Sequence, residues 1–233
     1  MKKTSQALIY SLFALTVLFP AGRLLCALVG YQFLLFSNTG FAVALALLSV
    51  CAVVVSFLSK EGIGRIAGVF AVLLPVLALI NSLFLIFANV NAFGVLGLVV
   101  AFGCSCCLTV KCVKSMELRI IALVVAGTLA VPTVFLGFIM LLFGSIGQNT
   151  VVRTVDSPGG TYYAQVIDSD QGALGGDTLV NVYEHKKLNA ILFTIQKKPK
   201  RVYTGDWRAY ENMQIYWRND NCLVINGSEN RIE

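Results

Sequence analysis

Five apolar runs, each about as long as a membrane-spanning helix, fill the first 149 of the 233 residues. A helix of roughly 20 residues crosses the hydrocarbon of a bilayer, because each residue advances the helix by about 1.5 Å. Short segments with charged or turn-forming residues separate the runs. The runs cover about residues 7–30, 39–58, 66–87, 92–110 and 120–143. The sequence therefore predicts a polytopic α-helical membrane protein with about five spans.

Composition agrees with this reading. The chain is 57% hydrophobic and 13% charged, whereas soluble domains carry about 25% charged residues. Its net charge of +6 lies wholly in residues 1–149, which hold eight Lys and Arg and two acidic residues. Residues 150–233 hold ten basic and ten acidic residues, so this part has no basic surplus with which to bind phosphates. We therefore expect the lipid bilayer as a partner and no nucleic acid.

The first apolar run has two interpretations. Lys2 and Lys3 precede it, as in a signal peptide, but no A-x-A-like cleavage site follows. We therefore favour a retained first span, kinked by Pro20, which cannot donate a helical hydrogen bond. Arg23 is the one charge inside this run.

The loops predict the orientation, because cytoplasmic loops of membrane proteins are enriched in Lys and Arg. Alternate segments hold seven such residues, and the opposite loops, about 31–38 and 88–91, hold none. The seven are Lys2, Lys3, Lys60, Arg65, Lys111, Lys114 and Arg119. We expect a multi-pass protein of the cytoplasmic membrane, with its N-terminus in the cytoplasm and residues 150–233 outside.

Residues 150–233 change to a strand-like pattern and form the second predicted domain, after a transmembrane region over 1–149. Alternating segments rich in Val, Tyr and Ile predict strands over 161–168, 178–184, 190–196, 213–217 and 222–225. Residues 157–160, Ser-Pro-Gly-Gly, predict a type II turn, and 197–201 predict a basic loop. The expected fold is a small antiparallel β-sheet domain.

The polar domain resembles a domain-of-unknown-function family found after membrane spans in Gram-positive bacteria. Three motifs carry the resemblance: Ser157-Pro158-x-Gly160-x-Tyr162, Gly172-Ala173 followed by Thr178-x-Val180-x-Val182, and Trp217-x-x-Asp220-x-x-Leu223-Val224-Ile225-Asn226-Gly227. The similarity covers roughly residues 155–230. It implies a bacterial, extracytoplasmic domain and brings no catalytic residues.

Arg23 and Asn81 are the polar residues of most interest in the predicted spans. Both lie about 23 Å from the cytoplasmic end of their helices, at about 1.5 Å per residue. A charge inside a membrane indicates a functional site by default. The alternative is that Arg23 reaches the outer headgroups and Asn81 bonds to a neighbouring helix.

Asp168, Asp170 and Asp177 flank a Gly-rich loop. Carboxylates at alternate positions before a Gly suit a hard cation such as calcium. The pattern has no bidentate Glu, so an ordinary solvated hairpin loop is the other interpretation. We expect no cofactor and no resident metal.

No catalytic constellation is visible. His185 is the only histidine, so a Ser-His-Asp or Cys-His arrangement has little to draw on, and we expect no enzyme. The first functional hypothesis is an integral membrane protein that anchors an extracytoplasmic β domain for partner binding or sensing. Its spans would pack against a membrane-protein partner or a second copy. A small-solute or ion permease is the alternative, and an immunity or envelope-stress protein is a weaker third.

Overall fold

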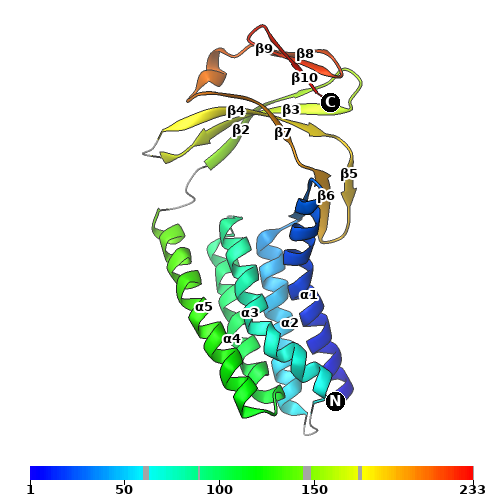
Figure 1. Cartoon of the computed structure of the whole chain (residues 1–233), viewed down its shortest axis with the longest axis vertical. Coiled ribbons are helices and arrows are strands. Elements are labelled where there is room, and N and C mark those ends of the chain that lie inside the picture. The colour runs from blue at the N-terminus through cyan, green and yellow to red at the C-terminus, as the bar shows by residue number, and fades with distance from the viewer. Residues whose placement is uncertain (60–62, 89, 144–147, 173–174, 233) are drawn as a thin grey trace. The chain divides into compact units, whose positions relative to one another are not determined.

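The protein is described by a computed structural model that covers residues 1–59, 63–88, 90–143, 148–172 and 175–232. Its described N-terminal part contains five helices that are long and apolar enough to cross a membrane (Figure 1). They are α1 (Lys2–Leu28), α2 (Asn38–Leu58), α3 (Arg65–Phe87), α4 (Ala92–Cys112) and α5 (Met116–Phe143). The predicted polytopic helical region is therefore confirmed. Lys60, one of the seven predicted cytoplasmic cations, lies outside the described residues.

Side chains at the helix starts explain two of the boundaries. The Ser37 hydroxyl accepts a hydrogen bond from the Gly40 amide at 2.9 Å and caps α2. Asn91 caps α4 in the same way, through its side-chain oxygen and the Gly94 amide at 2.9 Å. Such caps satisfy amides that have no partner within the helix.

The first four helices pack closely. Phe13 of α1 stacks on Phe70 of α3, with ring centroids 4.3 Å apart. A buried hydrogen bond of 2.7 Å joins the Ser5 and Ser56 hydroxyls of α1 and α2. A Cβ on Gly97 of α4 would lie 3.1 Å from the Ala42 carbonyl oxygen, so glycine permits α2 and α4 to approach closely.

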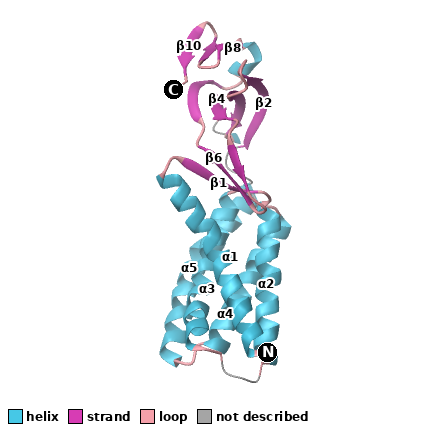
Figure 2. Cartoon of the chain, turned by 90° about the vertical axis from the view of Figure 1, so that its right-hand side faces the viewer, coloured by secondary structure: helices cyan, strands magenta, loops and turns pink. Residues whose placement is uncertain are grey.

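The C-terminal domain consists of antiparallel sheets (Figure 2), as the sequence predicts. The first sheet has the order β2-β3-β4-β7, and the second has the order β10-β9-β8. The strands are β2 (Gln148–Asp156), β3 (Tyr162–Asp170), β4 (Gly176–Glu184), β7 (Lys200–Asp206), β8 (Ile215–Asn219), β9 (Cys222–Ile225) and β10 (Ser228–Arg231).

One face of the four-stranded sheet packs on the β8–β10 sheet and forms the core. Ala164 and Val166 of β3 lie opposite Val182 and Val180 of β4. Because side chains alternate between the faces of a strand, these positions share one face. The remaining buried members of this core are Met213, Trp217, Leu223, Ile225 and Ile232.

A third sheet draws on a segment that the sequence predicts to be a loop. It has the order β1-β6-β5, with β1 (Tyr31–Leu35), β6 (Phe193–Lys197) and β5 (Lys187–Asn189). The Lys198 amide donates to the Gly30 carbonyl at 3.0 Å, and the Phe36 amide donates to the Leu192 carbonyl at 3.0 Å. The strands therefore run antiparallel, and the predicted loop 31–38 is largely a strand.

The structure also corrects two local predictions. The basic segment 197–201 is not wholly a loop, because β7 begins at Lys200. In the turn after β2, the Gly160 amide donates to the Ser157 carbonyl at 2.9 Å, but the positive φ of 68° belongs to Gly160. A type II turn would need the positive φ at Gly159, so the type II assignment is wrong.

Contacts within the chain divide it into two compact units. The helical unit comprises Met1–Leu25, Leu35–Leu142 and Ile191–Phe193. The β unit comprises Cys26–Leu34, Phe143–Ala190 and Thr194–Glu233. The tip of the β5–β6 hairpin therefore belongs with the helices, and most of β1 belongs with the β domain.

Candidate functional site

Asn81, one of the two intramembrane candidates, bonds to a carbonyl that a proline leaves free. Its side chain is fully buried in α3, and its amide nitrogen donates to the Thr16 carbonyl of α1 at 2.7 Å and to the Leu77 carbonyl at 2.8 Å. Thr16 lies four residues before Pro20, which has no N–H to donate to it. Asn81 therefore supplies the hydrogen bond that Pro20 withholds.

The same arrangement occurs at a second proline, which the sequence reasoning did not single out. Pro75 of α3 leaves the Ala71 carbonyl without its usual helical partner. The Thr109 hydroxyl of α4, which is fully buried, donates to this carbonyl at 2.7 Å. A proline and the position four residues before it are visible in the sequence, but the helix that supplies the donor is not.

Arg23 has different neighbours. Its guanidinium lies 5.1 Å from the ring centre of Phe84 in α3 and 5.6 Å from that of Phe19 in α1. Such cation–π contacts stabilise a charge on aromatic faces. Arg23 and Asn81 thus both lie along the contact between α1 and α3, but the structure gives each its own partners and no hydrogen bond between them.

The three predicted cation ligands are not brought together. Asp168 and Asp170 lie on one face of β3, whereas Asp177 lies opposite Ser169 and therefore on the other face. Asp170 accepts from the Gly172 amide at 2.7 Å, and Asp177 accepts from the Gln171 side chain at 3.2 Å. Among the described residues, no group of three His, Cys, Asp or Glu could hold a metal ion.

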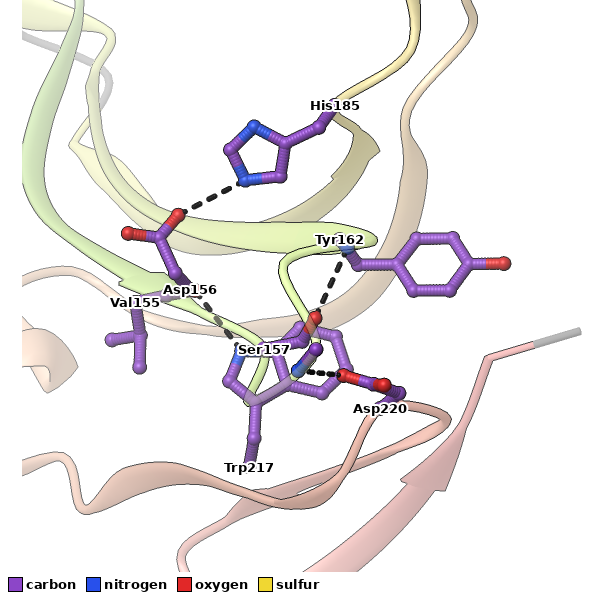
Figure 3. Close-up of polar contacts among 8 residues, drawn as sticks. Val155, Asp156, Ser157, Tyr162, His185, Trp217 and Asp220 are labelled. Atoms are coloured by element: carbon purple, nitrogen blue, oxygen red, sulfur yellow. Dashed lines mark hydrogen bonds and ion pairs between the residues drawn. The ribbon is translucent and has the colours of Figure 1, made fainter.

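Motifs that lie far apart in the sequence meet at the turn between β2 and β3 (Figure 3). The Asp220 carboxylate accepts from the Gly159 amide at 2.6 Å. The Trp217 indole N–H donates to the Val155 carbonyl at 3.0 Å, and the Ser157 hydroxyl accepts from the Tyr162 amide at 3.1 Å. These contacts fasten the β8–β9 hairpin to the β2–β3 hairpin, so the motif residues hold the fold together. Ala173 of the second motif lies outside the described residues.

The candidate binding site is a cleft of about 180 Å³ on the core side of the four-stranded sheet. Its lining residues come from β2, β3 and the segment around the 3-10 helix η2 (Ala209–Asn212). They are Val152, Arg153, Val166, Tyr210, Glu211 and Met213. The volume lies below the range of about 300–1,000 Å³ typical of drug-sized ligands. It suits one side chain or one small polar group.

A bulge in β2 helps to shape this cleft. The register shifts between Val151 and Arg153, so Val152 is the extra residue and Arg153 lies opposite Val166. Bulges redirect side chains in this way. The Arg153 guanidinium donates to the Met213 carbonyl at 3.2 Å, which holds the cation at the edge of the cleft.

Asp168 lies beside the cleft and has an unused acceptor. One of its carboxylate oxygens accepts from the Tyr210 hydroxyl at 3.3 Å. The other oxygen is buried and has no partner among the described residues, and the same holds for the hydroxyl of Thr178, which lies directly opposite Asp168 on β4. Buried polar groups usually have partners, so this pair can accept a hydrogen bond from an internal water.

Tyr210 connects this pair to the cleft. Burial and the neighbouring Asp168 carboxylate raise the pKa of Tyr210 above its usual value. The hydroxyl therefore stays protonated and remains a donor to Asp168 at physiological pH. Arg153, Glu211 and Tyr210 give the lining of the cleft one cation, one carboxylate and a phenol, and Asp168 lies behind Tyr210. Sequence reasoning named only Asp168 among these four, because the others come together through the fold.

No family model, curated protein or solved structure matches this chain.

Proposed function

We propose that this integral membrane protein, with its C-terminal β domain, binds a polar group of a partner or ligand outside the cell. The cleft beside Tyr210 carries the proposal. The Glu211 carboxylate and the Tyr210 hydroxyl in its lining suit a group that donates hydrogen bonds, such as an ammonium or amide, and the Arg153 guanidinium offers donors beside them. A volume of about 180 Å³ favours one such group of a larger partner over a whole drug-sized ligand.

The pairing of β1 with β6 supports an arrangement in which the α1–α2 connection and the β domain share one side of the membrane. Strands that exchange hydrogen bonds must lie in the same compartment. Helices α2 to α5 make four crossings when all of them span, and an even number of crossings returns the chain to the side it left. The Lys and Arg bias of the opposite loops favours the extracytoplasmic side.

We propose a binding role without catalysis. The described residues that line the cleft include no Ser, Cys or His that could act as a nucleophile or general base. His185 bonds to Asp156 at 3.2 Å (Figure 3) and is not among the lining residues. The intramembrane residues Arg23 and Asn81 already contact groups of their own chain, which favours a structural role over a solute path.

The experiment is a purification of the full-length protein from its native membrane in mild detergent, with co-purifying proteins and small molecules identified by mass spectrometry. Glu211→Gln and Arg153→Gln remove the charges at the cleft. Arg218→Gln is the matched control, since Arg218 is exposed and pairs with Glu229 away from the cleft. We expect the bound species in the wild type and the control, and its loss from both cleft variants. Equal recovery from all four proteins, or no bound species in any, refutes the proposal.

A further inference from the structure

The tip of the β5–β6 hairpin exposes large apolar side chains. Ile191 is 95% exposed, and Leu188 and Leu192 are also exposed. Ile191 and Leu192 lie between strand residues Asn189 and Phe193, so the apolar side chains occur where a soluble hairpin would carry polar turn residues. Exposed apolar groups of this kind mark a surface that contacts something less polar than water.

A hydrogen bond joins this tip to the start of a helix that is long and apolar enough to span a membrane. The Leu192 carbonyl accepts from the Phe36 amide at 3.0 Å. Phe36 directly precedes Ser37, the residue that caps α2, and α2 is long and apolar enough to cross a membrane. The tip therefore lies at the end of a membrane span, and Phe36 itself is exposed there. This is the depth at which aromatic and apolar side chains meet the headgroup region.

Most of the basic residues of the β domain lie in this hairpin and directly beside it in the sequence. Residues 185–201 contain six Lys and Arg and no Asp or Glu. The other residues of 150–233 therefore hold four basic and ten acidic residues, from totals of ten and ten. Lys197 bonds to Glu184 at 2.6 Å, and none of the other five cations pairs with a described carboxylate. This stretch extends beyond the hairpin, since Lys200 and Arg201 begin β7, and its charge of +6 suits an anionic surface.

We propose that residues 185–201 form a second membrane attachment, in which Ile191 and Leu192 enter the outer leaflet and the basic residues contact anionic lipid headgroups. The occupant of this surface is lipid, because the hydrogen bond to Phe36 places the tip at the end of a span. The attachment is independent of the cleft at Tyr210. It is analogous to interfacial segments in which an apolar side enters the headgroup boundary and Lys or Arg face anionic lipids.

Tryptophan fluorescence in lipid nanodiscs tests this attachment on the full-length chain. Ile191→Trp places a reporter at the tip, and its exposure leaves room for the larger ring. Thr161→Trp, at an exposed position of the turn between β2 and β3, is the matched control. Phospholipids brominated near the headgroup end of the acyl chain quench only an indole that reaches them. We expect loss of most of the fluorescence added by Trp at 191, and no such loss at 161.

Quenching at 191 that does not exceed quenching at 161 overturns the proposal, because the tip would then lie in water. A blue-shifted but unquenched signal at 191 also overturns it and indicates a protein contact, such as a second copy. Hydrogen exchange of residues 185–201 provides a second measurement without substitutions at the tip. We expect slower exchange in nanodiscs that contain phosphatidylglycerol than in phosphatidylcholine alone, and equal rates would overturn the electrostatic part.

Discussion

The hydrogen bond from Asn81 to the carbonyl released by Pro20 makes a quantitative prediction. Asn81→Leu removes the 2.7 Å bond to Thr16 and replaces the amide with a side chain of similar size. Hydrogen bonds between helices in a membrane contribute about 0.6–1.7 kcal/mol, and leaving a buried carbonyl unpaired costs about 1–3 kcal/mol. The buried Asn81 oxygen has no partner among the described residues, so its removal offsets part of this loss. We expect a net destabilisation of about 1 kcal/mol.

A double-mutant cycle tests whether the loss of stability in Asn81→Leu comes from the carbonyl that Pro20 leaves without a partner. Pro20→Ala restores a backbone N–H that can bond to Thr16 within α1, so Asn81→Leu should cost much less in that background. The expected coupling between Asn81 and Pro20 is about 1 kcal/mol. The assay is equilibrium unfolding of the full chain in mixed micelles titrated with sodium dodecyl sulfate, followed by far-ultraviolet circular dichroism.

A second proline provides the control for this cycle. Pro75 releases the Ala71 carbonyl, which Thr109 satisfies, so Pro75→Ala should leave the cost of Asn81→Leu unchanged. The reasoning is refuted if Asn81 and Pro20 are additive to within about 0.3–0.5 kcal/mol. It is also refuted if Asn81 couples equally to both prolines.

Three further predictions concern the β domain and its side of the membrane. In intact protoplasts, a membrane-impermeant maleimide should label Ser228→Cys in the β domain and should not label Lys114→Cys, which should react only after lysis. The reverse result would show that the proposed topology is inverted. Asp220→Ala removes the 2.6 Å hydrogen bond to the Gly159 amide and should lower the free energy of unfolding by about 1 kcal/mol. Denaturant titration measures this change, and an unchanged unfolding midpoint would contradict a stabilising role of the bond. Asp168→Asn should lower the pKa of Tyr210, which the folded protein raises above its usual value. The raised pKa contributes stability below about pH 10, and this contribution is lost as the pH rises through the pKa of the folded state. Tyrosinate absorbance, taken as the difference from Tyr210→Phe, measures the shift.

The sequence predicts the helices well because length and apolar content decide them. Two of the helices, α2 and α4, begin at a side-chain cap, Ser37 or Asn91, that is legible in the sequence. The predicted strands over 161–168, 178–184 and 222–225 also correspond to observed strands. In β3 and β4 the core positions recur at every second residue, such as Val180 and Val182, which local alternation indicates. All four residues of β9 are buried, so a short apolar run indicates that strand instead.

Strands whose partners lie far away in the chain were missed. Residues 31–35 directly follow a predicted span, so the sequence indicates a loop there. They form a strand because they pair with β6, which lies far away in the sequence. The β9–β10 hairpin did carry a local signal, since Asn226-Gly227 has φ values of 50° and 81°, as a two-residue type I′ turn requires. Trp207 and Tyr216 are about half exposed, whereas Trp217 is buried in the core, so aromatic character alone does not identify the core positions of this sheet.

The candidate cleft could not be predicted, because its members come from separate segments. Asp168 is visible as one of three carboxylates near a Gly-rich loop, which favours a cation interpretation. Its nearest partner, Tyr210, is more than forty positions later and reaches it only through the fold. Arg153 faces the cleft because of a bulge at Val152, and no local pattern in the sequence indicates that bulge.

The pairing of β1 with β6 joins strands that are synthesised at widely separated times. Residues 31–35 are synthesised between the first two helices, whereas their partner strand follows only after three more helices and half of the β domain. At about 5–20 residues per second this is a delay of order 10 s. During that time Tyr31–Leu35 is a short strand without its partner, flanked by two inserted helices. The sheet is therefore completed only after all five helices have been synthesised, and a chain that ends before β6 leaves Tyr31–Leu35 without its neighbouring strand.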